Sequence, residues 1–303
     1  MCGLFNLHLI GLSEKRFFCV LVFLLKYYNI LMTKSSLAII IIISILSIII
    51  PIVTIVLINR KHKLKLWVNI SIPLVVISAV NSLGFLTYFL IHYHASEEVN
   101  AYLLDDNEVK VSSNSNYYFF DNISNNDKAL IFYGGAKVEE KSYAPMMNKL
   151  SHQGIDVFIT KMPLRFPLFS PMKAESIYKE NNTYKDVYIM GHSLGGVCAS
   201  MVLNKSSNDY KGIIFLGAYS NKPLDSKYKA LSIYGSEDKV LNLDAYNKNK
   251  SNLPTGYVEH VIEGANHANY GYYGNQKGDG KATISRESQI DLTVSYVSNF
   301  IGL

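Results

Sequence analysis

The chain has 303 residues, 49% of them hydrophobic, and a formal net charge of +5. That charge is uneven, because residues 1–92 hold eight Lys or Arg against one Glu, whereas the remainder carries 21 basic and 23 acidic residues. The basic excess belongs to the most apolar part of the chain, which indicates membrane topology and argues against a nucleic-acid-binding protein. The three scattered cysteines, Cys2, Cys19 and Cys198, exclude a disulfide framework and a cysteine metal motif.

Two uncharged stretches, residues 37–58 and 66–91, are 22 and 26 residues long. Each exceeds the roughly 20 residues that a helix needs to cross a hydrocarbon core. A buried helix of a soluble core would show a polar face, and neither stretch does. Pro51 and Pro73 are tolerable kinks inside a bilayer. We predict two transmembrane helices.

The connecting loop, residues 59–65, reads NRKHKLK and holds four fixed positive charges. By the positive-inside bias, this loop faces the cytoplasm. The sequence therefore predicts a multi-pass protein of the cell membrane, with the chain after residue 92 on the outer face. Residues 1–33 leave three interpretations open: a short third span, an uncleaved signal-like segment, or a misassigned start that precedes the true one at Met32.

Residues 95–303 alternate short strands with amphipathic stretches, which predicts an α/β domain with a mostly parallel sheet flanked by helices. An opening hairpin is expected from residues 99–104 and 108–111, with 105–107 as its turn, followed by an edge strand at 117–120. A buried central strand is expected at 129–133, ALIFY. The later strands are expected at 155–160, 186–190, 212–216, 230–234 and 257–262, and the helices at 142–153, 172–180, 194–204, 244–252 and 288–301.

The stretch GHSLG, residues 191–195, falls between a predicted strand and a predicted helix. The pattern G-x-S-x-G in that context is typical of a sharp turn that exposes a nucleophilic serine, here Ser193. The alternative is an ordinary glycine-rich turn. His192 is adjacent to the serine, but neighbouring side chains on a tight turn diverge, so it is expected to pack beneath the turn.

A serine needs a base and a group that orients the base. Asp238 and His267 each follow the end of a predicted strand, and the carboxyl ends of parallel strands share one edge of a sheet. We therefore expect Ser193, Asp238 and His267 to converge, in the chain order of α/β-hydrolases. Asp238 could instead be a turn residue; Glu237 is the competing acid, and His260 is expected to be structural.

Two amide groups are candidates for the oxyanion hole. One is the amide of Leu194, at the start of the predicted helix, where the first N–H groups have no partner. The second is expected at Gly135 or Ala136, in the GGAK loop after the ALIFY strand, although that loop can also be read as a simple turn. The loop between residues 216 and 230 is too short for an inserted lid domain, so the site is expected to be open.

Five stretches together resemble the α/β-hydrolase group called fold-5, a lidless branch akin to the dienelactone (carboxymethylenebutenolide) hydrolases. They are FYGGAKVEEKSYAPMMNKL, ITKMPLRFPLF, YIMGHSLGGV, SIYGSEDKVLN and IEGANHANYGYYGNQKGDGKATIS, within residues 99–303. The resemblance implies an α/β-hydrolase fold, with Ser193 as nucleophile, Asp238 as acid and His267 as base. The dienelactone enzymes use a cysteine nucleophile, so the serine here favours generic ester chemistry.

The sequence thus predicts a membrane-anchored serine hydrolase, a carboxylesterase that works through an acyl-enzyme and needs no metal or organic cofactor. Its expected partners are a small-molecule or lipid-like ester and the bilayer. An acyl pocket is expected from Met162, Phe166, Tyr270 and Tyr273, unless these aromatics only pack their loop. The alternatives are an acyltransferase with the same triad and an inactive membrane-anchored binding module.

Overall fold

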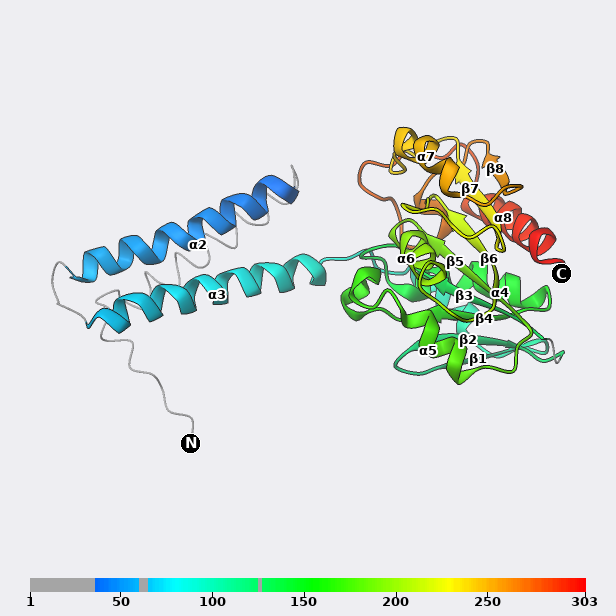
Figure 1. Cartoon of the computed structure of the whole chain (residues 1–303), viewed down its shortest axis with the longest axis horizontal. Helices are drawn as coiled ribbons and strands as arrows, with labels where there is room; N and C mark the ends of the chain where they lie inside the picture. The colour runs from blue at the N-terminus through cyan, green and yellow to red at the C-terminus, as the bar shows by residue number, and fades with distance from the viewer. Residues whose placement is uncertain (1–35, 60–64, 125–126) are drawn as a thin grey trace. The chain divides into compact units, whose positions relative to one another are not determined.

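A computed structural model describes residues 36–59, 65–124 and 127–303 (Figure 1). The chain divides into two compact units, Met1–Tyr88 and Phe89–Leu303. The uncertain N-terminal segment, residues 1–33, and residues 60–64 of the predicted cytoplasmic loop lie outside the described residues.

In the part of the first unit that the structure describes there are two long helices, α2 (Ser36–Asn59) and α3 (Leu66–Leu90). The last two residues of α3 belong to the second unit. Polar side chains join the helices: the Asn81 amide donates to Ser47 Oγ over 3.0 Å, and Asn59 donates to Asn69 over 2.8 Å. Most apolar side chains of α3 are exposed. Within the described residues, α3 is the helix that is long and apolar enough to cross a membrane.

The second unit is built on an eight-stranded sheet in the order β1-β2-β4-β3-β5-β6-β7-β8. From β4 to β8 all neighbours are parallel, and the antiparallel hairpin of β1 and β2 forms one edge. The strands are β1 (Val109–Ser113), β2 (Tyr117–Asn122), β3 (Lys128–Tyr133), β4 (Asp156–Thr160), β5 (Asp186–His192), β6 (Tyr210–Leu216), β7 (Lys229–Gly235) and β8 (Val258–Ile262).

Helices cover both faces of this sheet (Figure 1). Helices α4 and α8 pack on one face of the sheet, where their buried side chains form a first hydrophobic cluster with Leu130 and Phe132. Helices α5 and α6 pack on the other face, where they form a second cluster with Ala129, Ile131 and Tyr133. The α-helices are α4 (Ala144–His152), α5 (Lys173–Glu180), α6 (Leu194–Leu203), α7 (Leu243–Asn249) and α8 (Arg286–Ile301). The short 3-10 helices are η2 (Glu97–Leu103), η3 (Glu140–Tyr143), η4 (Pro163–Arg165), η5 (Pro167–Phe169), η6 (Lys250–Asn252) and η7 (Ala268–Tyr270).

Strand β3 shows why the central strands could be predicted from continuous apolar runs in the sequence. Its side chains alternate between the two clusters: Leu130 and Phe132 enter the first, whereas Ala129, Ile131 and Tyr133 enter the second. A strand buried on both faces needs apolar residues at every position. The single cysteine of this unit, Cys198 on α6, is fully buried and free.

The predicted opening hairpin is wrong. Residues 99–103 lie in the 3-10 helix η2, and the hairpin is formed by β1 and β2 around residues 114–116. Val99 is buried in the first cluster, and Tyr102 and Leu103 pack against that cluster. This is an i, i+3, i+4 spacing, which is helical and was misread as a strand.

Candidate active site

Ser193 occupies a strained turn between β5 and α6. Its φ is +54° and its ψ is −126°, a backbone conformation that residues with side chains rarely adopt. The flanking glycines are a steric requirement of this turn, because a Cβ on Gly191 would collide with the backbone of α6, and one on Gly195 would collide with the carbonyl of Tyr133. The Ser193 amide donates to the Leu216 carbonyl over 2.9 Å, which ties the turn to the end of β6.

Asp238 and His267 form a buried pair beyond the ends of β7 and β8. His267 Nδ1 lies 2.7 Å from Asp238 Oδ2, and each residue is 1% exposed. The other oxygen, Asp238 Oδ1, accepts the amides of Val240 and Leu241 at 2.9 and 2.8 Å. These amides fix the carboxylate, so one oxygen remains to orient the imidazole.

Gly217 brings the turn and the buried pair together. It follows Leu216, the acceptor for the Ser193 amide, and its φ is +52°. A Cβ at Gly217 would lie 2.9 Å from both Asp238 Oδ2 and His267 Nδ1. Only a residue without a side chain allows the backbone after β6 to pass this close to the pair.

The remaining nitrogen of the imidazole, His267 Nε2, is buried and has no hydrogen-bond partner among the described residues. The structure therefore places no hydrogen bond between it and Ser193. Hydrogen bonds between a nucleophile and its base are often long in ligand-free structures and tighten only when substrate binds. His260, the alternative histidine, stacks on the Tyr296 ring with centroids 3.9 Å apart and has a packing role.

His192 lies beneath the turn, as the sequence predicted, in a buried chain of hydrogen bonds. Its Nδ1 is 2.9 Å from the Tyr143 hydroxyl, and that hydroxyl accepts the Gly135 amide at 2.9 Å. Burial, and then the neighbouring His267, holds the pKa of His192 well below its ordinary range. Burial raises the pKa of Tyr143, so the phenol keeps its proton and can donate it to the neutral His192.

The backbone amides of Leu194 and Ala136 have no acceptor among the described residues, and the same is true of Gly195 and Gly134 beside them. Leu194 is the first residue of α6, where N–H groups have no partner within the helix. Of the two candidates in the loop after β3, Gly135 already donates to Tyr143. Between the two residues that the sequence analysis proposed in this loop, Ala136 is therefore the one whose amide is not already engaged.

The sequence analysis missed both Tyr143 and Gly217. Tyr143 ends the 3-10 helix η3, outside any motif, and its hydroxyl contacts depend on two other segments that only the fold brings near. The sequence signal for Gly217 was a glycine directly after a predicted strand. That signal marks a turn, but it does not reveal which groups the backbone approaches.

The four predicted pocket residues have different surroundings. Met162 contributes to a small hollow beside Gly134 and Gly135, whereas Phe166 packs against Phe89 and Phe169 with ring centroids 5.1 Å apart. The other two are buried in the core: Tyr270 packs against His192, and Tyr273 against Tyr143. The two tyrosines thus pack against the buried hydrogen-bonded pair of His192 and Tyr143.

Asp238 and His267 are buried, whereas Ser193 is partly exposed. No element is inserted between β6 and β7, and the segment after His267 is tied to residues that neighbour the pair. The Asp279 carboxylate accepts the amides of Ala268 and Lys239, at 2.8 and 3.3 Å. These two bonds link the segment after His267 to the loops that carry His267 and Asp238.

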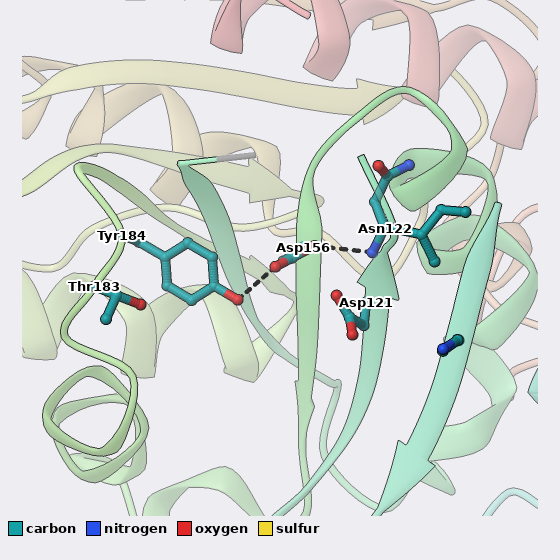
Figure 2. Close-up of a pocket in the computed structure, with 7 residues that line it drawn as sticks. Asp121, Asn122, Asp156, Thr183 and Tyr184 are labelled. Atoms are coloured by element: carbon teal, nitrogen blue, oxygen red, sulfur yellow. Dashed lines mark hydrogen bonds between the residues drawn. The ribbon is translucent and has the colours of Figure 1, made fainter. Parts of the chain in front are cut away.

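A larger hollow, of ≈ 390 Å³, lies elsewhere in the second unit, and Figure 2 shows the side chains that line it. It is lined by residues of β1, β2, β4 and the approach to β5, and its centre is the buried Asp156, which accepts the Tyr184 hydroxyl and the Asn122 amide. These residues lie at the amino ends of the parallel strands, whereas Ser193 lies at the carboxyl ends. Ligands of open α/β sheets bind at the carboxyl ends, so the chemistry is not assigned to this hollow.

Comparisons with solved structures find similar folds at low identity. Dienelactone hydrolase from Anabaena variabilis is 12% identical, covers 63% of this chain and 98% of its own, and has a TM-score of 0.48. A predicted CIB-like hydrolase from Thermoplasma acidophilum is 18% identical, with coverages of 63% and 98% and a TM-score of 0.47. Monoacylglycerol lipase from Paleococcus ferrophilus is 12% identical, with coverages of 57% and 94% and a TM-score of 0.45.

No curated protein matches the chain. The family model described as the alpha/beta hydrolase family matches residues 129–291, more than half of the chain, from the strand before the GGAK loop into α8. With the mostly parallel sheet and the strained serine turn between β5 and α6, this match identifies the chain as a member of the alpha/beta hydrolase family.

Proposed function

We propose that this alpha/beta hydrolase is a serine carboxylesterase with Ser193 as nucleophile, His267 as base and Asp238 as the orienting acid. The observation that carries the proposal is the 2.7 Å contact of His267 Nδ1 with Asp238, beside a serine held at a positive φ. A buried imidazole with one nitrogen fixed by a carboxylate and the other free is the arrangement that a general base requires.

In the proposed reaction, Asp238 keeps the proton of His267 on Nδ1, so that Nε2 can accept the proton of Ser193 Oγ. The oxygen attacks the ester carbonyl carbon, and the resulting oxyanion accepts the amide hydrogens of Leu194 and Ala136. His267 Nε2–H then protonates the leaving alcohol as the acyl-enzyme forms. A water molecule gives its proton to Nε2, attacks the acyl carbon and releases the carboxylic acid, and Ser193 regains its proton.

The substrate class that we propose is a small-molecule or lipid-like ester. Met162 lines a hollow beside Gly134 and Gly135, next to the proposed oxyanion hole; the hollow is too small to hold a water molecule, so an acyl chain could enter it only if side chains there move. The cysteine of the dienelactone enzymes is a serine here, which favours ordinary esters.

The proposed function is tested with the wild-type chain, a fluorophosphonate probe and a panel of p-nitrophenyl esters of increasing acyl length. Labelling together with ester hydrolysis supports a carboxylesterase, and the preferred length describes the acyl pocket. Labelling with transfer to an added alcohol in preference to water indicates an acyltransferase. If the folded protein is not labelled, it is an inactive binding module, and the proposal is wrong.

Tyr143 is predicted to position the oxyanion loop through its contact with Gly135. Replacing Tyr143 with phenylalanine leaves the Gly135 amide without its acceptor, so the loop loses the bond that holds the neighbouring Ala136 amide in place. We expect kcat to fall about tenfold with little change in KM, because the Ala136 amide is proposed to bind the oxyanion, which exists in the transition state and not in the bound substrate. Steady-state kinetics with a soluble p-nitrophenyl ester measures this.

Tyr178→Phe is a matched control, because its ring packs against Tyr210 away from the site. Equal losses of kcat in Tyr143→Phe and Tyr178→Phe, or a rise in KM alone, would count against a positioning role for Tyr143.

We also propose that α2 and α3 both span the membrane and that the hydrolase unit lies on its outer face. The support is the apolar surface of α3, the polar contacts between the helices and the basic loop between them. Protease added to intact cells is expected to cut a tagged chain within residues 95–303. A fully protected hydrolase unit, with an outer-surface control protein cut, would place it inside the cell.

A further inference from the structure

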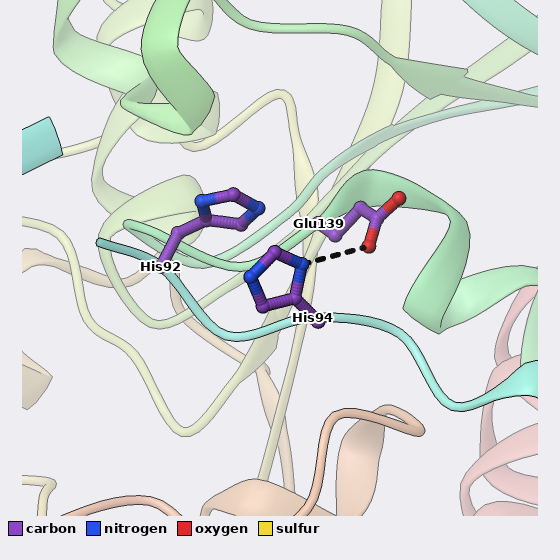
Figure 3. Close-up of side chains that lie close together, drawn as sticks. All are labelled: His92, His94 and Glu139. Atoms are coloured by element: carbon purple, nitrogen blue, oxygen red, sulfur yellow. Dashed lines mark ion pairs between the residues drawn. The ribbon is translucent and has the colours of Figure 1, made fainter. Parts of the chain in front are cut away.

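A second cluster of chemically active side chains, His92, His94 and Glu139, lies outside the proposed triad. Its two histidines are near the start of the second unit, Phe89–Leu303. Tyr93 forms a parallel bridge with Val138: its amide donates to the Lys137 carbonyl over 2.7 Å, and its carbonyl accepts the Glu139 amide over 2.9 Å. Alternate residues of an extended segment point to the same side. His92 and His94 therefore share one face, next to Glu139 (Figure 3).

The donor atoms of the three side chains are already close. One nitrogen of each histidine and one Glu139 oxygen all lie within 4.8 Å of one another. His94 Nδ1 is 3.9 Å from Glu139 Oε2, and the same oxygen accepts the Ala95 amide over 2.9 Å, which orients the carboxylate. In a tetrahedral zinc site the ligand atoms are about 3.3 Å apart, so small side-chain rotations suffice to reach that geometry.

His92 has the hydrogen-bond arrangement of a metal ligand. Its Nδ1 lies 2.7 Å from the Leu90 carbonyl, which can only accept, so the ring proton is on Nδ1. The lone pair is then on Nε2, which is buried and has no partner among the described residues. A histidine that donates one N–H to a backbone carbonyl and offers its other nitrogen is the usual form of a metal-bound imidazole.

From this geometry we propose that His92, His94 and Glu139 form a binding site for a divalent metal ion of the zinc class. Two imidazoles and a carboxylate suit Zn²⁺ and its transition-metal neighbours, whereas Mg²⁺ and Ca²⁺ prefer all-oxygen sites. With three protein ligands, the fourth position is left to water. The His94 side chain is 74% exposed, which leaves it free to turn onto the ion.

The metal would act as a clip between two segments far apart in sequence. Residues 92–94 follow the end of α3, and Glu139 lies three residues after Ala136 in the loop after β3. The bridge at Tyr93 is a single isolated pair, so a shared ion would add a strong link where backbone pairing is minimal. This site is separate from the proposed chemistry at Ser193 and does not depend on it.

The test is a competitive titration of the purified full chain in detergent, stripped of metal, with Zn²⁺ against a chromophoric chelator. We expect one Zn²⁺ per chain, and at least a tenfold loss of affinity in each of His92→Ala, His94→Ala and Glu139→Gln. Mg²⁺ is expected not to compete. His152→Ala is the matched control, because His152 also pairs with a carboxylate, Asp106, at 3.1 Å. The His152→Ala variant should bind Zn²⁺ with the affinity of the wild type.

Thermal unfolding gives a readout that does not depend on the chelator. Zn²⁺ is expected to raise the unfolding midpoint of the wild type and of His152→Ala, and not that of His94→Ala, whose exposed side chain can be removed without disturbing the core. Absence of saturable Zn²⁺ binding in the wild type, or equal binding by the double variant His92→Ala/His94→Ala, would overturn the proposal.

Discussion

Replacing Ser193 with alanine is expected to abolish labelling by a fluorophosphonate probe and to lower kcat/KM for p-nitrophenyl esters by at least about 10⁴-fold. The reason is that the variant removes the only atom proposed to bond to the acyl group, while His267, Asp238 and the two free amides remain. Alanine is smaller than serine and has no hydroxyl, so the strained turn at φ +54° is preserved without a new contact. Labelling, followed by in-gel fluorescence, and ester kinetics measure the two effects.

Ser200→Ala is the matched control for Ser193→Ala. Ser200 lies on the same helix, α6, is 2% exposed, and donates only to the Val197 carbonyl within that helix. Removal of the Ser200 hydroxyl should leave labelling and kcat/KM within about twofold of the wild type. Persistent labelling of Ser193→Ala would show that another residue is the nucleophile, and equal loss in both variants would point to damage of the helix.

The central strands and the serine turn were predictable because local physics dictates them. A strand buried on both faces must be apolar throughout, as in Lys128–Tyr133, and the turn at Ser193 tolerates only glycine at two flanking positions. Both requirements restrict the residue types within a short stretch of the sequence, so each can be recognised there. The pairing of His267 with Asp238 was inferable for a similar reason, since the carboxyl ends of neighbouring parallel strands meet at one edge.

What the sequence did not reveal depends on contacts between distant segments. Tyr143 acquires its role only when η3 brings it between the GGAK loop and His192. Asp279 ties the segment after His267 to the loop after β7, and its two acceptor contacts depend on amides of residues 11 and 40 positions away. Likewise, His92 and Glu139 are 47 positions apart in the sequence, and one isolated bridge at Tyr93 aligns them.

Replacing Asp238 with asparagine is expected to lower kcat/KM about 10⁴-fold while the protein stays folded. The amides of Val240 and Leu241 already donate to Oδ1, so an asparagine would keep its carbonyl oxygen there and turn its NH₂ toward His267. An amide donor facing Nδ1 moves the imidazole proton to Nε2. In that tautomer Nε2 has no lone pair to accept the proton of Ser193, so attack on the ester slows although the geometry is intact.

Glu237→Gln is the matched control, because Glu237 is the neighbouring acid and its amide donates to the Ala265 carbonyl, a bond that the substitution retains. We expect its kcat/KM to stay within about threefold of the wild type. Circular dichroism and the thermal midpoint, measured on both variants, separate a loss of catalysis from a loss of fold. A larger effect of Glu237→Gln than of Asp238→Asn would transfer the orienting role to Glu237, and an unchanged Asp238→Asn would mean that His267 does not act as the base.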